Sequence, residues 1–587
     1  MPGFEPVVAR FLEELFVLLP NVATRIGDHR YDDRWPDFTE AGRRERLAFA
    51  DRWEAELRAI DDATLDAGER IDRDLLLGEL SELRFHEAEL REPAWNPLAW
   101  VYTMGSGIHP LLAREFAPRH VRLASVAGRL EGIPAVIAAA QGVMGTHPTR
   151  PVSGFMAEVA AKRIGGVTAL ADEAVAAGEA AAAAGDADVA AVLPRLRAAA
   201  ETARGALDAI GAHLVSDVVP AAAGSPLLGR ELFTAKLRHT LRDPDVTPEE
   251  ILGRAEREFV AIRAEMVRIA RDIWSYWVPG EPAPDDDGVL VRRVLDATSN
   301  EHPAADELVR WCYAELERVE RFCRERDVIG LTDDPLVIDW TPEFLRSFGG
   351  AMLDSPGPLD HGQKAFFSIT PVPEDWPADQ QESYLREMNT RQMQLLVIHE
   401  AVPGHYLQGA YANHGSSLAR RVFPSGVFAE GWAVYVTQVM LDRGYCADDA
   451  ALWLNHWKFY LRSVANTIID VRIHTMGMTT DECVDFLVDQ AFQERGEAIH
   501  KDERARLSST QLSTYFAGSL GLWDIEHELR VRAAVAAGAS ADAVPAPRVV
   551  GGYPATPGFD ERAHLEAVIS HGSPPIPILR RIMLGDE

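Results

Sequence analysis

Apolar residues recur every three or four positions along most of the chain, which is the spacing of amphipathic helices. This spacing holds over residues 38–92 and over the alanine-rich stretch 154–214. Within the second stretch, Ala184-Gly185-Asp186 is the expected break between helices. Leucine, valine and arginine are interleaved with the alanines, so we predict two or three long antiparallel helices there rather than a low-complexity segment.

The middle of the chain combines a strong helix start with a less helical stretch. Thr247-Pro248-Glu249-Glu250 has the residues of a capping box with proline at the first helical position, and it predicts a helix to about Tyr276. Residues 331–375 lose the helical spacing. Two short runs in this stretch, 335–340 and 364–370, are rich in residues that favour strands. They predict a small β element in an otherwise helical protein.

Helical spacing resumes at about residue 378 and continues to about residue 539. The last 45 or so residues are rich in proline and glycine, so we expect them to wrap the surface. No internal repeat is visible. The pattern therefore predicts an all-α protein, built mainly of long helices, with a small β element near residues 335–370.

The charge of the chain limits its partners. Its 587 residues carry a formal net charge of −31, with a pI near 5.0. Phosphate binding needs a basic surface, so the acidic excess argues against a nucleic-acid partner, and it also argues against docking on an anionic membrane. The simplest interpretation of this charge is solubility. The oligomeric state does not follow from the sequence.

The cysteines and the first residues bear on localisation. The N-terminus lacks a basic region, and Phe11–Pro20 is apolar but interrupted by two glutamates, which is typical of an amphipathic helix. No uninterrupted apolar run has the length of a membrane span. We therefore expect a cytoplasmic protein. Four scattered cysteines lack a C-x-x-C pair and are expected to be reduced thiols: Cys312, Cys323, Cys446 and Cys483.

The segment His399-Glu-Ala-Val-Pro-Gly-His405 has the residue types of a zinc hydrolase. Such an enzyme needs imidazoles on the metal and a carboxylate that deprotonates a water. The usual spacing is H-E-x-x-H, one helical turn, but here the second histidine comes two residues late. In a straight helix, side chains six residues apart differ by about 240° in direction, so both rings could not reach one metal.

Pro403 and Gly404 change that geometry. Proline cannot donate a hydrogen bond to the preceding turn, and glycine accepts unusual backbone angles. We therefore expect the helical segment Gln381–Ile398, which leads into His399, to be interrupted before His405. The interruption would bring the second ring back beside the first. The alternative is a helix end that carries two histidines by chance.

Glu430 lies in an apolar helical segment, Gly426–Gln438. Burying an unpaired carboxylate is costly, and a metal ion would satisfy it. The adjacent glycine would allow a close approach of the backbone. Two histidines and a downstream glutamate make the three-ligand set of a catalytic zinc, with one position open for water. The alternative is an ion pair of Glu430 with Arg420 or Arg421.

A third segment, Leu452–Met476, is predicted to be helical and carries a polar stripe. Asp470 and His474 are four residues apart, so they are neighbours that could orient a ligand or donate to an oxyanion. A solvated helix face is the alternative. Tyr515, in a stretch of small residues, is a further candidate oxyanion donor, although a packed tyrosine is the simpler interpretation. The stripe repeats every four residues: Arg462, Asn466, Asp470 and His474.

Together these segments resemble the bacterial family known as domain of unknown function 885. The H-E-A-x-P-G-H and E-G-W-A blocks, in this order, are its most specific features. Ser509 is a departure, since the family has proline there. The resemblance covers nearly the whole chain, through Pro20–Tyr31, His399–Gln408, Glu430–Ala433, Asp470–His474 and Thr510–Gly518.

This family is in turn similar to helical M32-type zinc carboxypeptidases. The resemblance therefore implies an M32 carboxypeptidase-like, all-α fold with a long central groove. It implies one helical body over residues 1–587, with an N-terminal portion, 1–245, and a catalytic portion, 246–587, that holds the motif. Few members have an assigned substrate, so the resemblance supports the fold and the metal better than the reaction.

The sequence thus predicts a zinc-dependent hydrolase of peptide or small amide bonds, with one zinc per chain. His399, His405 and Glu430 hold the metal, and Glu400 is the general base. Non-peptide amides or esters are alternative substrates. A metal-free helical scaffold that binds a peptide or ligand is the competing hypothesis, supported by the late second histidine. The remaining candidates are Tyr515 or His474 as oxyanion donor, Asp470, Arg472 and Asn466 as supporting or substrate-binding groups, and Phe366–Ile369 as a strand that pairs with an extended peptide.

Overall fold

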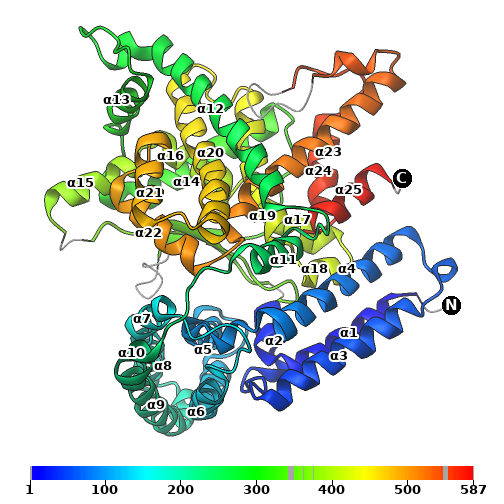
Figure 1. The fold of residues 1–587 in the computed structure, drawn as a ribbon, viewed down its shortest axis with the longest axis vertical. Coiled ribbons are helices and arrows are strands. Elements are labelled where there is room, and N and C mark those ends of the chain that lie inside the picture. The colour runs from blue at the N-terminus through cyan, green and yellow to red at the C-terminus, as the bar shows by residue number, and fades with distance from the viewer. Residues whose placement is uncertain (1–2, 342–349, 361, 374–375, 546–552, 586–587) are drawn as a thin grey trace. The chain divides into compact units, whose positions relative to one another are not determined.

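The computed structural model describes residues 3–341, 350–360, 362–373, 376–545 and 553–585 (Figure 1). Contacts between Cα atoms divide the chain into two compact units. Unit 1 consists of residues 1–226 and 356–363, and unit 2 of residues 227–355 and 364–587. Both units are helical, and the strands form a single small sheet in unit 2. This confirms the predicted all-α class with a small β element, while the proposed portions 1–245 and 246–587 stay a prediction.

Unit 1 contains the helices predicted over residues 38–92 and 154–214. Three helices occupy the second stretch, and residues 184–186 separate the last two, as expected. α6 packs along α9, and α8 packs against both. The helices are α1 (Glu5–Leu18), α2 (Pro20–Ile26), α3 (Glu40–Arg58), α4 (Ala67–Arg84), α5 (Pro97–Ala113), α6 (Arg119–Val143), α7 (Gly154–Arg163), α8 (Gly165–Ala183), α9 (Ala187–His213) and α10 (Val219–Ala221).

Within the described residues, α6 is the one helix long and apolar enough to cross a membrane by length and composition. Half of its most apolar window is buried inside the protein. Leu130 and Ile133, near its middle, are completely buried. α6 therefore has the burial of a core helix in unit 1, which accounts for its hydropathy.

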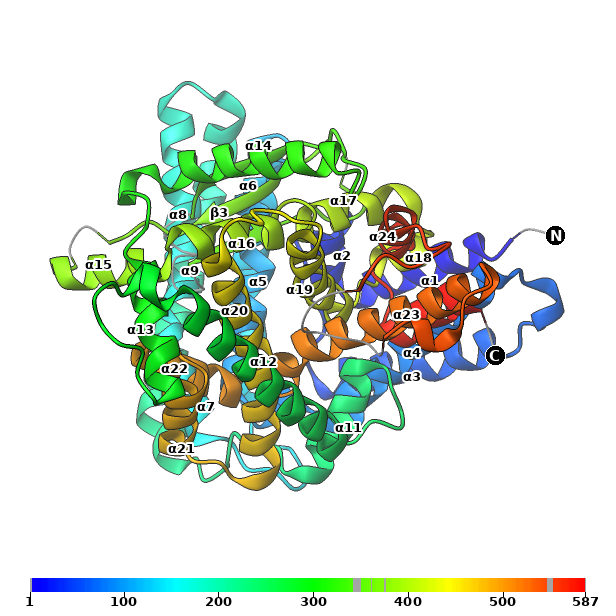
Figure 2. The same cartoon turned by 90° about the horizontal axis from the view of Figure 1, so that it is seen from above.

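Unit 2 is built around two pairs of long helices. α12 packs along α20, and α19 packs along α23 (Figure 2). Thr247 caps α12 by accepting a hydrogen bond from the Glu250 N–H, which confirms the predicted start. The helices are α11 (Arg230–Leu241), α12 (Pro248–Trp277), α13 (Asp287–Ser299), α14 (Leu308–Glu325), α15 (Ala378–Glu387), α16 (Thr390–Glu400), α17 (His405–Gly415), α18 (Leu418–Val422), α19 (Gly426–Asp442), α20 (Ala450–Val471), α21 (Thr480–Asp485), α22 (Arg495–Leu507), α23 (Thr514–Ala536), α24 (Glu561–Ser570) and α25 (Ile576–Leu584).

The sheet has the strand order β1-β3-β2, with β1 (Leu336–Trp340), β2 (Ala351–Asp354) and β3 (Ala365–Ile369). β3 pairs parallel with β1 and antiparallel with β2. The two predicted strands are thus confirmed, and β2 is an addition. Because β3 is paired along both sides, Phe366–Ile369 has no free edge for a peptide, so the proposed strand pairing there is wrong.

Two other expectations about helix limits need correction. The segment Gln381–Ile398 is not one helix, because α15 ends at Glu387 and Asn389 starts α16. Its side-chain oxygen accepts hydrogen bonds from the N–H groups of Arg391 and Gln392, which caps the second helix. The C-terminal residues also do more than wrap the surface, since α24 and α25 bury Leu565 and Leu579 completely. Residues 546–552 lie outside the described residues.

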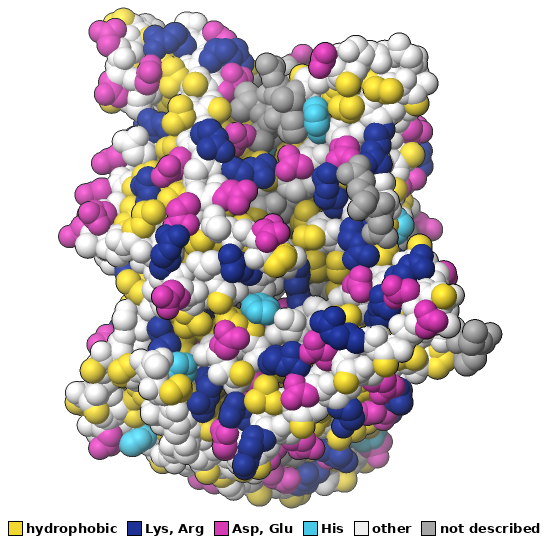
Figure 3. Space-filling model, turned by 45° about the vertical axis from the view of Figure 1, so that its right-hand side comes forward, with side chains coloured by type: hydrophobic (Ala, Val, Ile, Leu, Met, Phe, Trp, Pro, Cys, Tyr) yellow, Lys and Arg dark blue, Asp and Glu magenta, His cyan; other side chains and the backbone are white. Residues whose placement is uncertain are grey.

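The surface carries charges of both signs. On the face shown in Figure 3, Lys and Arg side chains are interspersed with Asp and Glu among the described residues. The acidic excess of the whole chain is therefore not collected into one patch on this face. The four cysteines are free, and three of them are buried.

Candidate metal centre

α16 ends directly after the first histidine of the motif and its glutamate. The four residues 401–404 are not helical, and α17 begins at His405. Ala401 has φ −102° and ψ −93°, which lies outside the helical region. The chain is therefore interrupted within residues 400–405, and this confirms the prediction made from Pro403 and Gly404.

Two contacts fix the conformation of this break. The indole N–H of Trp432 donates a 2.9 Å hydrogen bond to the carbonyl oxygen of Pro403. The N–H of Gly404 donates to the carbonyl oxygen of Ile398 at 3.0 Å. A Cβ atom at Gly404 would lie 1.8 Å from the carbonyl oxygen of His399, so a residue with a side chain does not fit there.

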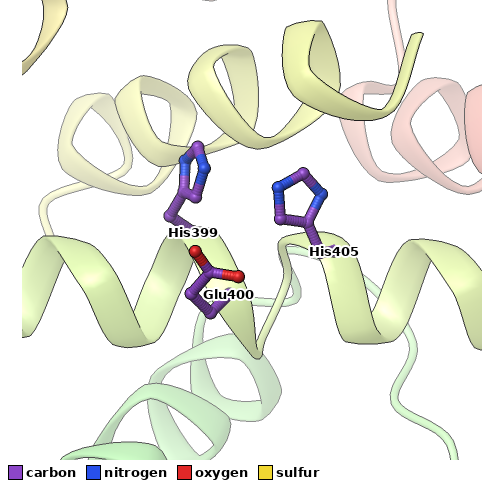
Figure 4. A group of neighbouring side chains, drawn as sticks. All are labelled: His399, Glu400 and His405. Carbon is purple, nitrogen blue, oxygen red and sulfur yellow. The ribbon is translucent and has the colours of Figure 1, made fainter. Parts of the chain in front are cut away.

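The break turns the two imidazoles toward each other. The ring centroids of His399 and His405 are 4.8 Å apart, and the ring planes meet at 83°. One ligand atom each from His399, Glu400 and His405 lies within 4.8 Å of the other two. Figure 4 shows these three side chains gathered around the break between α16 and α17. Both rings therefore reach a common centre despite the late second histidine.

Glu430 comes to this centre from the first turns of α19. Its Oε2 atom lies 3.6 Å from Nε2 of His405, which is ion-pair distance and too long for a hydrogen bond. No arginine of the described residues pairs with it, so the alternative partners Arg420 and Arg421 are not used. Gly431 does allow a close backbone approach, but toward Gly518 of α23 rather than toward the histidines.

Burial and mutual charges set the protonation of the four groups. Burial lowers the pKa of His399 to about 3, with a smaller contribution from His405, so this ring is neutral. Burial also raises the pKa of Glu400. At His405 the effect of burial is outweighed by Glu430 and Glu400, which raise its pKa, and at Glu430 it is outweighed by His405, which lowers its pKa. The two carboxylates thus shift in opposite directions, an arrangement typical of paired catalytic acids.

Two neighbouring elements complete the surroundings. The backbone of Leu353 in β2 acts on the Glu400 carboxylate and lowers its pKa, against the larger effect of burial. Phe459 of α20 packs edge-on against His399, with ring centroids 5.4 Å apart. The centre is therefore built from α16, α17 and α19, with β2 and α20 holding one residue each in place.

The residues present fit a zinc ion. Nδ1 of His399 is buried and has no hydrogen-bond partner in the described part of the chain. An unpaired buried nitrogen is costly, and a metal ion can satisfy such an atom. Two imidazoles with a carboxylate form the nitrogen and oxygen donor set of catalytic zinc. His399, His405 and Glu430 would hold the ion, with Glu400 beside it.

Asp470 acts on the segment that leads into α23. Its carboxylate accepts hydrogen bonds from the Thr510 N–H at 3.1 Å and from the Ser513 hydroxyl at 2.7 Å. Burial raises the pKa of Asp470 to about 7. Tyr515 follows directly in the first turn of α23, so Asp470 positions the turn that presents this tyrosine.

Tyr515 lies within electrostatic reach of the metal centre. Burial, followed by the charge of Glu430, raises the pKa of its hydroxyl, which therefore stays protonated near neutral pH. The hydroxyl accepts a 3.3 Å hydrogen bond from Nη2 of Arg504. Tyr515 is thus the better of the two oxyanion candidates named from the sequence.

His474 has a different role from the one expected. Its Nδ1 accepts a hydrogen bond from the Leu228 N–H at 3.3 Å, and its Nε2 donates to the Ala505 carbonyl at 2.9 Å. The ring also stacks on Phe233, with centroids 5.5 Å apart. Since both nitrogens are engaged with the backbone, His474 cannot serve as the oxyanion donor.

Arg472 and Asn466, the two remaining candidates, have different surroundings. Arg472 pairs with Glu256 of α12 at 2.7 Å and lies over the Phe486 ring, so it joins the end of α20 to its neighbours, and a contact with substrate stays a prediction. Asn466 is 4% exposed, and its side-chain oxygen has no hydrogen-bond partner among the described residues. A contact between Asn466 and substrate stays a prediction.

Sequence reasoning missed several residues around the centre. Trp432, Leu353 and Phe459 hold or cover the motif, and the block E-G-W-A was a signal for the first of them. Lys501 and Arg504 of α22 were also missed. α22 carries charged residues on all sides, so its sequence gives no sign of which face is buried.

An all-α body with a histidine and glutamate centre at an interrupted helix defines a class of candidate metalloproteins. Within it, the chain belongs to the family described as "Bacterial protein of unknown function (DUF885)", whose model matches residues 20–583. The family resemblance stated from the motifs is therefore confirmed. A likeness to M32 carboxypeptidases does not follow from this match. None of the curated proteins matches the chain.

Two solved structures share the fold over essentially the whole chain. One is described as "a putative lipoprotein of unknown function" from Shewanella oneidensis, with 29% identity and a TM-score of 0.80 over 100% of both chains. The other is described as "the putative lipoprotein" from Colwellia psychrerythraea, with 14% identity and a TM-score of 0.76 over 100% of this chain and 99% of the other. Neither description names an activity.

The same comparison corrects the expected localisation. Both similar structures are described as a "putative lipoprotein", and lipoproteins of this kind are held at a membrane by a lipid. The expectation of a cytoplasmic protein is therefore wrong. It rested on the composition of the first residues and on the lack of an uninterrupted apolar run of membrane-spanning length, and such local signals are weaker than a likeness that extends over the whole chain.

Proposed function

We propose that this protein is a zinc-dependent hydrolase of peptide or small amide bonds. The observation that carries the proposal is the helix break that brings the rings of His399 and His405 to 4.8 Å between centroids. A bound zinc ion would lower the pKa of a water at its open position and so supply the nucleophile. The likeness to M32-type carboxypeptidases belongs to this proposal, and a non-peptide amide or ester is the near variant of its substrate.

Each of the protein residues then has a separate role in the reaction. His399, His405 and Glu430 hold the metal. Glu400 accepts a proton from the attacking water and passes it to the leaving amine, and its raised pKa suits a group that does both near neutral pH. Tyr515 donates its hydroxyl proton as a hydrogen bond to the oxyanion that forms from the substrate carbonyl.

The competing hypothesis is a metal-free scaffold that binds a peptide or ligand. Its main support was the spacing of the histidines, which would place the rings on different faces of a straight helix. The break at residues 401–404 removes that argument. The buried Nδ1 atom of His399, which has no hydrogen-bond partner in the described part of the chain, favours the metal, and a metal analysis separates the two hypotheses.

The test is the metal content of the full chain purified without a histidine tag. About one zinc per chain should copurify, because the described part of the chain has one such set of three ligands, which holds one ion and leaves one position open for water. His399→Ala and His405→Ala should each lose it. His500→Ala, at an exposed position on α22, is the matched control and should keep it. Normal zinc content in both ligand variants would overturn the assignment, and no metal in the wild type would favour the scaffold.

A further inference from the structure

Two positive charges on α22 lack a carboxylate partner. Lys501 is only 8% exposed, and it has no hydrogen bond or ion pair with any described residue. Arg504 donates from Nη2 to Gln511 at 3.0 Å and to the Tyr515 hydroxyl at 3.3 Å, and both acceptors are neutral. Residues three apart on a helix lie on the same face, so the two cations are neighbours.

A third cation close to them is already neutralised. Arg462 of α20 forms an ion pair with Glu497 and another, at 3.8 Å, with Glu387. The positive charges of Arg462 and Arg504 act on Lys501 together with burial, and they lower its pKa well below the usual range. Without an anion at this place, Lys501 therefore holds its proton less firmly than a lysine in water does. An unpaired buried charge is costly unless a ligand pairs with it.

Arg504 brings this basic cluster, which consists of Lys501, Arg504 and Arg462, close to the metal centre. After burial and the two histidines, Arg504 is the next charge that acts on the pKa of Glu430. Phe459, which packs against His399, lies three residues before Arg462 and hence on the same face of α20. α22 thus brings Arg504 within electrostatic reach of Glu430, and α20 carries Arg462 on the face that also presents Phe459.

We propose that Lys501 and Arg504 form an anion subsite beside the metal centre that binds a carboxylate of the substrate. The inference rests on the proposed hydrolase function and narrows its substrate to peptides or amides with a carboxylate close to the scissile bond. A carboxylate is an acceptor that both cations can share through charge-assisted hydrogen bonds. It comes either from the free C-terminus of a peptide or from an acidic side chain.

The test is binding, measured by calorimetry on the full-length chain carrying Glu400→Gln, so that no turnover intervenes. Three probes separate the sources: acetyl-Ala-Ala with a free C-terminus, the same dipeptide as its amide, and acetyl-Asp-Ala-amide. At least one of the two acids should bind about tenfold or more tightly than the neutral amide, as a hydrogen bond between charged groups would give. The acid that binds more tightly identifies the source of the carboxylate.

Lys501→Met and Arg504→Gln, each added to that chain, should reduce the preference for the acid about tenfold or more. Arg495→Gln is the matched control, because it removes a positive charge from the exposed start of the same helix. Circular dichroism checks the folding of each variant, and Arg504 is exposed, so its replacement leaves the core intact. Equal binding of acids and amide to the starting chain, or an equal loss in Arg495→Gln, would overturn the subsite.

The hydrolase proposal and the anion-subsite proposal are contradicted by different results. A chain that contains zinc and cleaves amides, but does not distinguish the acids from the amide, contradicts the subsite alone. A chain without zinc that still prefers an acid, with the preference lost in Lys501→Met and Arg504→Gln, contradicts the hydrolase and leaves the anion subsite standing.

Discussion

Glu400 and Glu430 approach the histidines from different elements and in different states. Glu400 follows His399 directly, and burial raises its pKa. Glu430 comes from α19, lies 3.6 Å from His405, and has a lowered pKa because that histidine outweighs burial. The carboxylate that stays ionised is the better metal ligand, and the one with the raised pKa is the better proton acceptor and donor.

Exchanging each glutamate for glutamine tests this division. Glu400→Gln should keep the zinc and lose about 10²–10⁴-fold in turnover, which is the usual effect of removing a general base. Glu430→Gln should lose most of the zinc, because a neutral amide is a weaker ligand. Metal analysis and amide hydrolysis on the same samples measure both effects. Zinc lost from Glu400→Gln and kept in Glu430→Gln would mean that the roles are exchanged.

At the residue scale, the sequence predicted the site residues that stand close together in one short motif. His399, Glu400 and His405 stand in one heptapeptide, and the Pro-Gly pair predicted the break that unites them. His474 was assigned wrongly, because a polar stripe at helical spacing looks the same whether it faces a cavity or bonds to backbone groups, as this one does. Lys501 and Arg504 were missed because the face of a charged helix that lies against its neighbours is set by those neighbours and not by the helix sequence.

At the scale of elements, the crossing of α19 and α23 positions two candidate site residues at once. A Cβ at Gly518 would lie 2.0 Å from the carbonyl oxygen of Val427, and a Cβ at Gly431 would lie 2.4 Å from the carbonyl carbon of Gly518. The two helices therefore touch through their backbones, which only glycine permits. Glu430 precedes one glycine and Tyr515 lies one turn before the other.

Gly518→Ala should force the two helices apart. We expect a loss of about 1–3 kcal/mol in the free energy of unfolding, as for other overpacked sites, and a lower zinc content because Glu430 moves. Gly426→Ala, on α19 with open space around it, is the control and should be neutral or slightly stabilising. Thermal unfolding and metal analysis measure both variants. Equal stability of the two variants would show that the crossing is not tight.

Helix limits followed from the sequence where a cap or a glycine marked them, as at Thr247 and at residues 184–186. The sheet was predicted from the sequence only in part. β2 was missed because its four residues are all half-buried and show no alternation. Its pairing, which places β3 in the centre, also escaped prediction, since a strand pattern does not state which neighbour the strand joins.

For the whole molecule, the division into two units depends on contacts that no local pattern reports. The chain leaves unit 2 after Ser355, joins unit 1 over residues 356–363, and returns to unit 2 at Lys364. In unit 1 the Leu359 N–H donates to the carbonyl oxygen of Ile26 at 2.9 Å. Asp360 also accepts a hydrogen bond from the ring of His29, 331 positions earlier. Such a contact cannot be deduced from the residues around it.

His29 fixes this returning segment by means of its charge. Its Nδ1 lies 2.8 Å from an oxygen of Asp32, and its Nε2 lies 2.9 Å from an oxygen of Asp360. Both partners are acceptors, so only the protonated ring satisfies both. Burial opposes the charge on the ring, but the two carboxylates outweigh it and raise the pKa of His29 to about 9 from an ordinary value of 6.5.

The sign of the resulting pH dependence follows from these two pKa values. A raised pKa means that the folded protein holds the proton more tightly than the unfolded chain, so the stabilisation is complete below about pH 6.5 and is lost as the pH rises through about 9. His29→Gln should therefore lower the melting temperature most near pH 6, where the loss is on the order of 3 kcal/mol at most, and progressively less toward pH 9.5. Other titrating groups are common to both proteins and cancel in the difference. His86→Gln, at a half-buried position directly after α4 where the ring lies 3.6 Å from a single carboxylate, is the control and should give a small difference at every pH. A His29→Gln difference that stays constant from pH 6 to pH 9.5 would show that the contact of His29 with Asp360 contributes through packing and not through charge.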